Sequence, residues 1–179
     1  ANANTLIKSK ENNIIITENK DSYLTNLASQ LKAEIFEHKN YVGGRYSVLS
    51  EVGMLPAELM NLNENKFKQF NSLIKNKAFV NNLINNVSAT LNLIKNGKYT
   101  SIILNYDDRS EHLFKWYQQL IAESLGKKSK GILPIVSSMP KDNHSLMQLY
   151  LDGPNNSFYT FFNTLKNNVV KIKNNKILN

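Results

Sequence analysis

Short runs of β-branched and apolar residues alternate along this chain with longer stretches whose apolar residues recur at helical spacing. The runs that we expect to form strands are residues 13–17, 34–37, 99–106 and 131–137, with further β-like pieces at 158–162 and 169–172. The connections between the expected strands are too long for hairpins, and such connections usually contain a helix that leads to a parallel strand. The alternation therefore predicts an α/β fold with a parallel sheet.

The expected helices follow from apolar spacing and from residues that cap or stop a helix. They are a helix opened by Asp21, one from about Ser47 to Asn61 that Pro56 bends or breaks, two amphipathic helices across 64–97 that end at Gly97, one from a capping box of Asp108 and Glu111 to Leu125, and one from Asp142 to Tyr150. The inner face of the helix that ends at Leu125 is expected to carry Leu113, Tyr117, Leu120, Ile121 and Ser124. Pro134 places its strand at a sheet edge or at a strand start. We divide the chain into an α/β part over 1–62, a helical connector over 63–97 and a second α/β part over 98–179.

Composition bounds the class of protein. The chain has 179 residues, 41% hydrophobic and 20% charged, and no cysteine, which excludes disulfides, cysteine-ligated zinc and a cysteine nucleophile. No apolar run approaches the roughly 18 residues that span a bilayer. The first residues lack a signal-peptide pattern, so we expect a cytoplasmic location and no membrane partner.

The net charge is +8, but 20 of the 22 basic residues are scattered lysines, which indicate a solvated surface rather than a nucleic-acid site.

The first candidate site is the sequence Gly43-Gly44-Arg45, between a predicted strand and a predicted helix. Two glycines let the backbone adopt positive φ and approach a ligand closely. An arginine ahead of a helix N-terminus suits an anion, or negative charge that develops on oxygen. A tight turn with a solvated arginine is the simpler interpretation, and the pattern alone favours it. The scarcity of arginine in this chain shifts the balance modestly toward function.

Two further segments carry groups suited to proton transfer. Glu123 falls in the last turn of a predicted helix, where partial burial and the helix dipole would raise its pKa toward that of a general base. The commoner case there is a surface glutamate paired with Lys127. His144 falls in the first turn of the last predicted helix, where the dipole favours a neutral imidazole that accepts a proton, although a polar helix cap is more common. His38 and His112 lack the spacing of a metal site or triad, and we interpret both as surface residues.

Three segments, in this order along the chain, resemble the glucose-6-phosphate isomerase family. They are residues 42–56, which read Val-Gly-Gly-Arg-Tyr-Ser-Val-Leu-Ser and continue to Val-Gly-Met-Leu-Pro; residues 122–127, Ala-Glu-Ser-Leu-Gly-Lys; and residues 143–154, in which Asn-His-Ser leads to Gln-Leu-Tyr-Leu-Asp-Gly-Pro. Motifs of other enzymes, namely a Gly-Lys-Ser/Thr phosphate loop, a Gly-x-Ser-x-Gly elbow and a zinc-ligand cluster, are missing. The resemblance implies an SIS-type three-layer α/β/α fold with a parallel sheet, a helical connector and an incomplete second lobe.

The resemblance implies an aldose–ketose isomerase of glycolysis and gluconeogenesis, which interconverts glucose 6-phosphate and fructose 6-phosphate through a cis-enediolate. Glu123 would move a proton between C2 and C1, and Arg45 would stabilise the enediolate. Gly43 and Gly44 would adjoin the substrate together with Arg45. His144 would assist ring opening, and in the family it comes from the neighbouring subunit, which implies a homodimer. No metal or organic cofactor is implied, since a carboxylate, a cation and a proton shuttle suffice.

The resemblance covers roughly residues 11–165 and also identifies what this sequence lacks. The family has a Ser-Lys-Ser-Gly-x-Thr loop that holds the sugar phosphate, and a C-terminal lysine that works with the histidine. The loop has no match here, and the lysines at 166, 171, 173 and 176 have no matching context. We therefore expect a central fragment that is inactive or nearly so. One alternative is a non-catalytic, sugar-phosphate-binding SIS module that regulates another process; a basic nucleic-acid binder is a weaker alternative.

Overall fold

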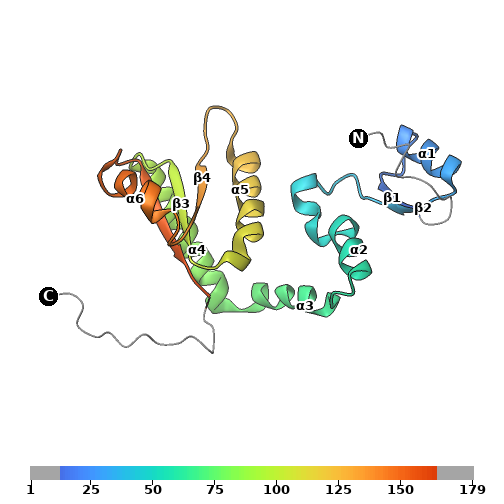
Figure 1. Cartoon of the computed structure of the whole chain (residues 1–179), viewed down its shortest axis with the longest axis horizontal. Coiled ribbons are helices and arrows are strands. Elements are labelled where there is room, and N and C mark those ends of the chain that lie inside the picture. The colour runs from blue at the N-terminus through green and yellow to red at the C-terminus, as the bar shows by residue number, and fades with distance from the viewer. Residues whose placement is uncertain (1–12, 165–179) are drawn as a thin grey trace. The chain divides into compact units, whose positions relative to one another are not determined.

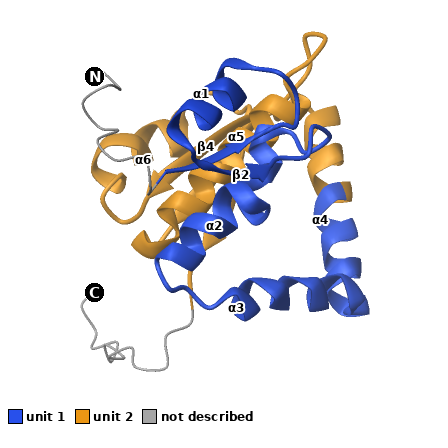
Figure 2. Ribbon diagram, turned by 90° about the vertical axis from the view of Figure 1, so that its right-hand side faces the viewer, with its two compact units in different colours: residues 1–87 blue, residues 88–179 orange. Residues whose placement is uncertain are grey.

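A computed structural model describes residues 13–164 of the chain (Figure 1). The chain splits into two compact units, residues 1–87 and 88–179, and each is described here by itself (Figure 2). The division falls inside the long helix α4 (Lys77–Lys95). The β-like piece expected at 169–172 and the C-terminal lysines lie outside the described residues. The three-part division into 1–62, 63–97 and 98–179 stays a prediction.

The first unit begins with a parallel strand pair. Strands β1 (Ile14–Thr17) and β2 (Glu34–Glu37) pair in register from Ile14 with Glu34 to Thr17 with Glu37, and helix α1 (Tyr23–Leu31) connects them. The helix begins later than expected, because Ser22 rather than Asp21 is its N-cap. The Ser22 hydroxyl accepts from the Thr25 N–H at 3.3 Å, and the Thr25 hydroxyl accepts from the Ser22 N–H at 2.9 Å. This reciprocal capping fixes where the crossover leaves β1.

A corner of two short helices follows β2. A 3₁₀ helix, η2 (Gly44–Leu49), leads into α2 (Glu51–Leu59). The expectation of one helix from Ser47, broken at Pro56, is therefore wrong. Pro56 lies inside α2 and removes only its own N–H, and its carbonyl still accepts from Met60 N at 3.0 Å. The corner is tight, because a Cβ placed on Gly53 would lie 2.0 Å from the carbonyl oxygen of Val48.

The helical segment predicted across 64–97 is present and leaves most of its apolar side chains exposed. It consists of α3 (Glu64–Lys68), the 3₁₀ helix η3 (Gln69–Lys75) and α4. As expected, α4 stops at Gly97, which has φ +79°, a conformation that glycine adopts without strain. No α4 side chain is buried by the described residues, and Leu83, Ile84 and Leu91 are each more than half exposed.

The second unit is a three-stranded parallel sheet in the order β4-β3-β5, which confirms the α/β class. Its elements are β3 (Thr100–Asn105), α5 (Glu111–Leu125), β4 (Leu133–Ser138), α6 (Asn143–Asp152) and β5 (Ser157–Phe162). Pro134 lies in β4, an edge strand of this sheet, as expected for a residue with no N–H to donate. Since β4 and β5 flank β3, right-handed crossovers place α5 and α6 on opposite faces, as Figure 1 shows.

The core of the second unit forms around the central strand. Ile102 and Leu104 are 3–4% exposed and pack with Met139, while the rings of Phe114 of α5 and Phe162 meet edge to face at a centroid distance of 4.7 Å. Of the residues expected on the inner face of α5, Tyr117, Leu120, Ile121 and Ser124 are partly buried, but Leu113 is 51% exposed. A 3₁₀ turn, η4 (Asp108–Ser110), precedes α5. Phe114, one residue or about 100° further around the helix than Leu113, is the buried residue of α5.

Among residues 13–164, no helix combines the length and the apolar character that crossing a bilayer requires.

Candidate active site

The Gly43-Gly44-Arg45 turn lies in the first unit, between β2 and η2, as the sequence predicts. The positive φ expected of its glycines is wrong: Gly43 has φ −63° as the N-cap of η2, and the described glycines with positive φ are Gly97 and Gly131. A Cβ on Gly44 would meet nothing within 4 Å. Gly44 therefore leaves open space beside the backbone, which lets another molecule approach it, whereas a Cβ on Gly43 would lie 3.6 Å from the Tyr46 ring.

Arg45 is half-buried and lies over its neighbour Tyr46. The guanidinium Cζ is 4.5 Å from the centre of the Tyr46 ring, within the range of a cation–π contact. Ser47 stabilises the turn: it is 7% exposed, and its hydroxyl donates to the Gly44 carbonyl at 2.7 Å. Arginine keeps its charge and a planar fork of donors, so this turn presents a fixed cation suited to oxyanions.

His38 has a different role from the one the sequence indicated. Its side chain is 17% exposed, which contradicts the interpretation of a surface residue, and both of its ring nitrogens face acceptors. Nδ1 contacts the carboxylate of Glu51, and Nε2 lies 3.0 Å from the carbonyl oxygen of Val42. The bond with Glu51 raises the pKa of His38 against some opposition from burial. The pKa of Glu51 is lowered, first by its own backbone N–H and then by His38.

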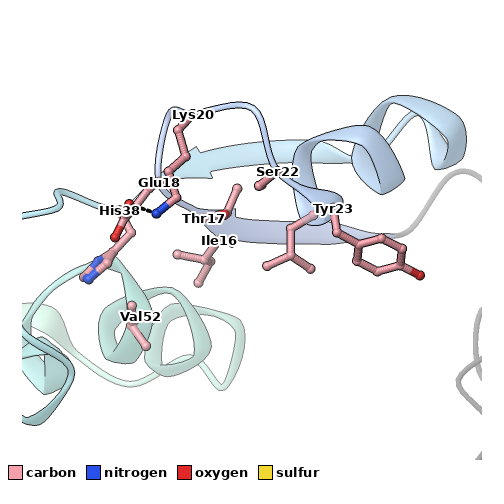
Figure 3. A pocket seen from close by; sticks show the side chains of 9 residues that line it. Ile16, Thr17, Glu18, Lys20, Ser22, Tyr23, His38 and Val52 are labelled. Atoms are coloured by element: carbon pink, nitrogen blue, oxygen red, sulfur yellow. Dashed lines mark ion pairs between the residues drawn. The ribbon is translucent and has the colours of Figure 1, made fainter.

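A cavity of about 410 Å³ opens at the carboxyl ends of β1 and β2 (Figure 3). Its lining comprises Ile16, Thr17, Glu18, Lys20, Ser22, Tyr23, Leu24, His38 and Val52. Figure 3 shows the His38 ring beside α2, the helix that carries Val52. Glu18 and Lys20 form an ion pair in the loop between β1 and α1. Arg45 does not line this cavity. The cavity and the Gly-Gly-Arg turn are therefore separate features that share His38 as a neighbour.

Glu123 lies in the last turn of α5, as predicted, in the second unit. Its side chain is exposed, so the described residues do not supply the partial burial that the sequence argument required. Gln119, one turn earlier, donates its side-chain N–H to Glu123 Oε1 at 3.2 Å. The helix ends at Gly126, where a Cβ would lie 2.5 Å from the carbonyl oxygen of Ala122. Glycine is thus needed for the chain to leave the helix directly after the carboxylate.

His144 is the second residue of α6 and lies in its first turn, as predicted. It is exposed. The residue before the helix, Asp142, accepts from the Ser138 N–H at 2.8 Å and so fixes the turn between β4 and α6, instead of capping the helix with its side chain. His112 lies on α5 and is exposed, which agrees with the interpretation of a surface residue.

A polar cluster at the carboxyl end of β3 was not predicted. Asp107, which is 5% exposed, accepts from Arg109 Nε at 3.1 Å and from the Ser110 hydroxyl at 3.0 Å. Arg109 also donates to the Thr164 hydroxyl at 3.3 Å, which ties β3 to the end of β5. The expected capping box of Asp108 and Glu111 is wrong, since α5 has no side-chain cap. The bond from Arg109, followed by that from Ser110, lowers the pKa of Asp107.

The three residues with proposed chemical roles are divided between the units. Arg45 belongs to the first, and Glu123 and His144 belong to the second. Their convergence on one substrate therefore stays a prediction. Across residues 13–164, no group of three or more His, Asp or Glu side chains is arranged to hold a metal ion.

Comparison with known proteins gives consistent matches over most of the chain. A family model described as phosphoglucose isomerase matches residues 10–155. The glucose-6-phosphate isomerase of Methanocaldococcus jannaschii is 34% identical, with 87% of this chain and 42% of that protein covered. That of Caldanaerobacter subterraneus is 31% identical, with 89% and 36% covered. The chain thus spans about two fifths of the length of these relatives.

A solved structure supports the same fold. A hypothetical protein from Thermus thermophilus matches with a TM-score of 0.68 and 26% sequence identity, over 83% of this chain and 37% of that one. The likeness is consistent with the three-layer α/β/α arrangement expected from the sequence.

Proposed function

This chain belongs to the phosphoglucose isomerase family, and we propose that it supplies the proton-transfer groups of an aldose–ketose isomerase that interconverts glucose 6-phosphate and fructose 6-phosphate. The family match over residues 10–155 carries this proposal, because that range includes Arg45, Glu123 and His144. Three observations support the assigned roles: a Cβ on Gly44, next to Arg45, would meet nothing within 4 Å, Glu123 lies in the last turn of α5, and His144 is exposed in the first turn of α6.

The proposed reaction is a redox-neutral proton transfer within the open-chain sugar. The Glu123 carboxylate takes the proton from C2, the C–H electron pair becomes a C1=C2 double bond, and the carbonyl pair moves to O1. In the resulting cis-enediolate the O2–H proton moves to O1. The electron pair left on O2 then forms the carbonyl at C2, and the C1=C2 electron pair takes the proton back from Glu123 at C1. A carboxylate that moves one proton between adjacent carbons acts as base and then as acid.

Arg45 would stabilise the negative charge on the enediolate oxygens. The stacking on Tyr46 and the anchored carbonyl of Gly44 support this role, because a cation held before the charge develops needs no reorganisation during the step. Gly43 and Gly44 would let the sugar approach the backbone. His144 would shift a proton during ring opening, from a neighbouring subunit of a homodimer, and its exposure on α6 suits such a role.

The isolated chain is proposed to be inactive or nearly so. No Ser-Lys-Ser-Gly-x-Thr stretch, which would hold the sugar phosphate, occurs in its 179 residues. A coupled assay of the isolated chain should therefore give little turnover of glucose 6-phosphate. Robust turnover would contradict this part of the proposal.

The chemical role is tested in a full-length chimera in which residues 10–155 replace the matching segment of the Methanocaldococcus jannaschii relative. Loss of tritium or deuterium from C2 of the substrate should be catalysed by the chimera and abolished by Glu123→Gln, with the affinity for the sugar phosphate largely retained. Glu111→Gln, an exposed glutamate of the same helix, is the matched control and should exchange normally. Ligand binding with no exchange in the unsubstituted chimera would instead favour a regulatory sugar-phosphate-binding module.

A further inference from the structure

His38 occupies a place between the two ends of the segment that carries Arg45. One ring nitrogen contacts Glu51, the first residue of α2, and the other lies 3.0 Å from the carbonyl oxygen of Val42, the residue before Gly43. The whole Gly-Gly-Arg turn and η2 lie in sequence between these two contacts. The ring thus spans the base of the turn.

Both contacts require the ring to donate. A carbonyl oxygen accepts only, and an ionised carboxylate accepts only. A neutral imidazole has one N–H, so one tautomer sets the lone pair of Nδ1 against the Glu51 carboxylate and the other sets the lone pair of Nε2 against the Val42 carbonyl. The imidazolium has two N–H groups and satisfies both partners at once. The observed geometry therefore fits the charged form.

The charges around His38 agree with a stable imidazolium. Glu51 faces it from α2, and Glu18 acts on it from the loop after β1, where it pairs with Lys20. Lys39 pairs with Glu37 at 2.8 Å, which offsets its charge. The bond with Glu51 keeps the pKa of His38 above its ordinary value of about 6.5, and the bond with the Val42 carbonyl and the charge of Glu18 add smaller increases.

We infer that His38 is a positioning residue for Arg45, which clamps the Gly-Gly-Arg turn when the ring is doubly protonated and releases the Val42 carbonyl when it is neutral. The inference rests on the proposed function, since Arg45 meets a substrate only there. Its structural half is independent of that function: the backbone of the turn should respond to the protonation of one histidine. Its kinetic half is that the clamped turn keeps the Arg45 guanidinium where it can contact the enediolate oxygens.

The structural half is tested by NMR titration of the 179-residue chain. The imidazole signals of His38 and the amide signals of Gly44 and Arg45 should shift with one common midpoint above pH 6.5. Glu51→Gln should lower that midpoint for the ring and the amides together, and His38→Gln should remove the inflection from the amides. His112→Gln, the same change at an exposed histidine, should leave it in place. Amides that do not follow the His38 titration, or an inflection that survives His38→Gln, would overturn the inference.

The kinetic half uses the full-length chimera described above. Loss of one positioning hydrogen bond should lower kcat by about tenfold or less and leave KM nearly unchanged. The alkaline limb of the kcat profile assigned to His38 should disappear in His38→Gln and move to lower pH in Glu51→Gln. A change confined to KM, or an unchanged alkaline limb in both variants, would contradict the role in positioning Arg45.

The two proposals fail separately. If Glu123→Gln leaves C2 exchange intact while the amides still titrate with His38, the chemical assignment is wrong and the clamp stands. If Glu123→Gln abolishes exchange while the amide signals of Gly44 and Arg45 do not follow the titration of His38, the isomerase assignment stands and the clamp is wrong.

Discussion

The guanidinium of Arg109 donates from Nε to the buried carboxylate of Asp107 over 3.1 Å, directly after the central strand of the second unit. The same carboxylate accepts from Ser110, and Arg109 reaches on to Thr164 beyond β5. One carboxylate therefore shapes the start of α5 and helps join two strand ends. We therefore expect the stability of the second unit to depend on the charge of Asp107.

We expect stability to fall in acid through Asp107. Its pKa is lowered in the folded state, so its contribution is fully present above the unfolded value of about 3.9 and is lost as the pH falls through the folded pKa. Asp107→Asn should destabilise the chain at neutral pH and flatten this acid limb in urea titrations followed by circular dichroism. Asp108→Asn, at the exposed neighbouring position, should keep the wild-type profile, and an equal effect of both changes would contradict the assignment.

Phe114 should be a main determinant of stability in the second unit. It is 8% exposed, and its ring meets Phe162 edge to face. Phe114→Ala should lower the free energy of unfolding by about 3–5 kcal/mol, because it leaves a cavity against the sheet. Leu113→Ala, one residue earlier but 51% exposed, should change it by less than about 0.5 kcal/mol. Similar losses for the two variants in a denaturant titration would mean that α5 packs in another phase.

Gly53 should tolerate no side chain. A Cβ there would lie 2.0 Å from the Val48 carbonyl oxygen, so η2 and α2 would have to separate. Gly53→Ala should cost about 1–3 kcal/mol, although alanine is the better helix former. Gly44→Ala is the matched control for stability, since its Cβ would meet nothing within 4 Å. Thermal unfolding of both variants measures the difference, and a Gly53→Ala variant as stable as the wild type would show that the corner is loose.

A homodimer with His144 supplied across the interface makes a quantitative prediction. Glu123→Gln and His144→Asn chimeras should each be inactive, yet a refolded equimolar mixture should recover about a quarter of the wild-type activity, because half the dimers are mixed and each holds one intact site. Each variant refolded alone is the control. No recovery, with mixed dimers demonstrated by differential tagging, would place Glu123 and His144 of one site on the same subunit.

Much of the fold could be predicted because it depends on neighbours in the chain. The β-branched run of β1 and the positive φ of Gly97 follow from conformational preferences within a few residues. Parallel pairing follows from the length of the connections. The placement of Glu123 at a helix end and of His144 at a helix start is local in the same sense.

The details that failed depend on contacts in the folded chain that residue type alone does not encode. Leu113 and Phe114 are both apolar, and the folded chain buries Phe114, which packs against Phe162 of β5, while Leu113 is exposed. Asp107 and Asp108 are the same residue type in succession, and the position of Arg109 and Ser110 selects the first.

The amino-acid sequence by itself determined the family, the α/β class and the order of the candidate residues, because each of these follows from patterns among residues that are close together in the chain. Only the tertiary structure decided that His38 is held by Glu51 and Val42, thirteen and four residues away. No periodicity encodes such a pairing. It exists because the turn after β2 brings the start of α2 back to the ring, and the protonation of an imidazole depends on what lies beside it in space.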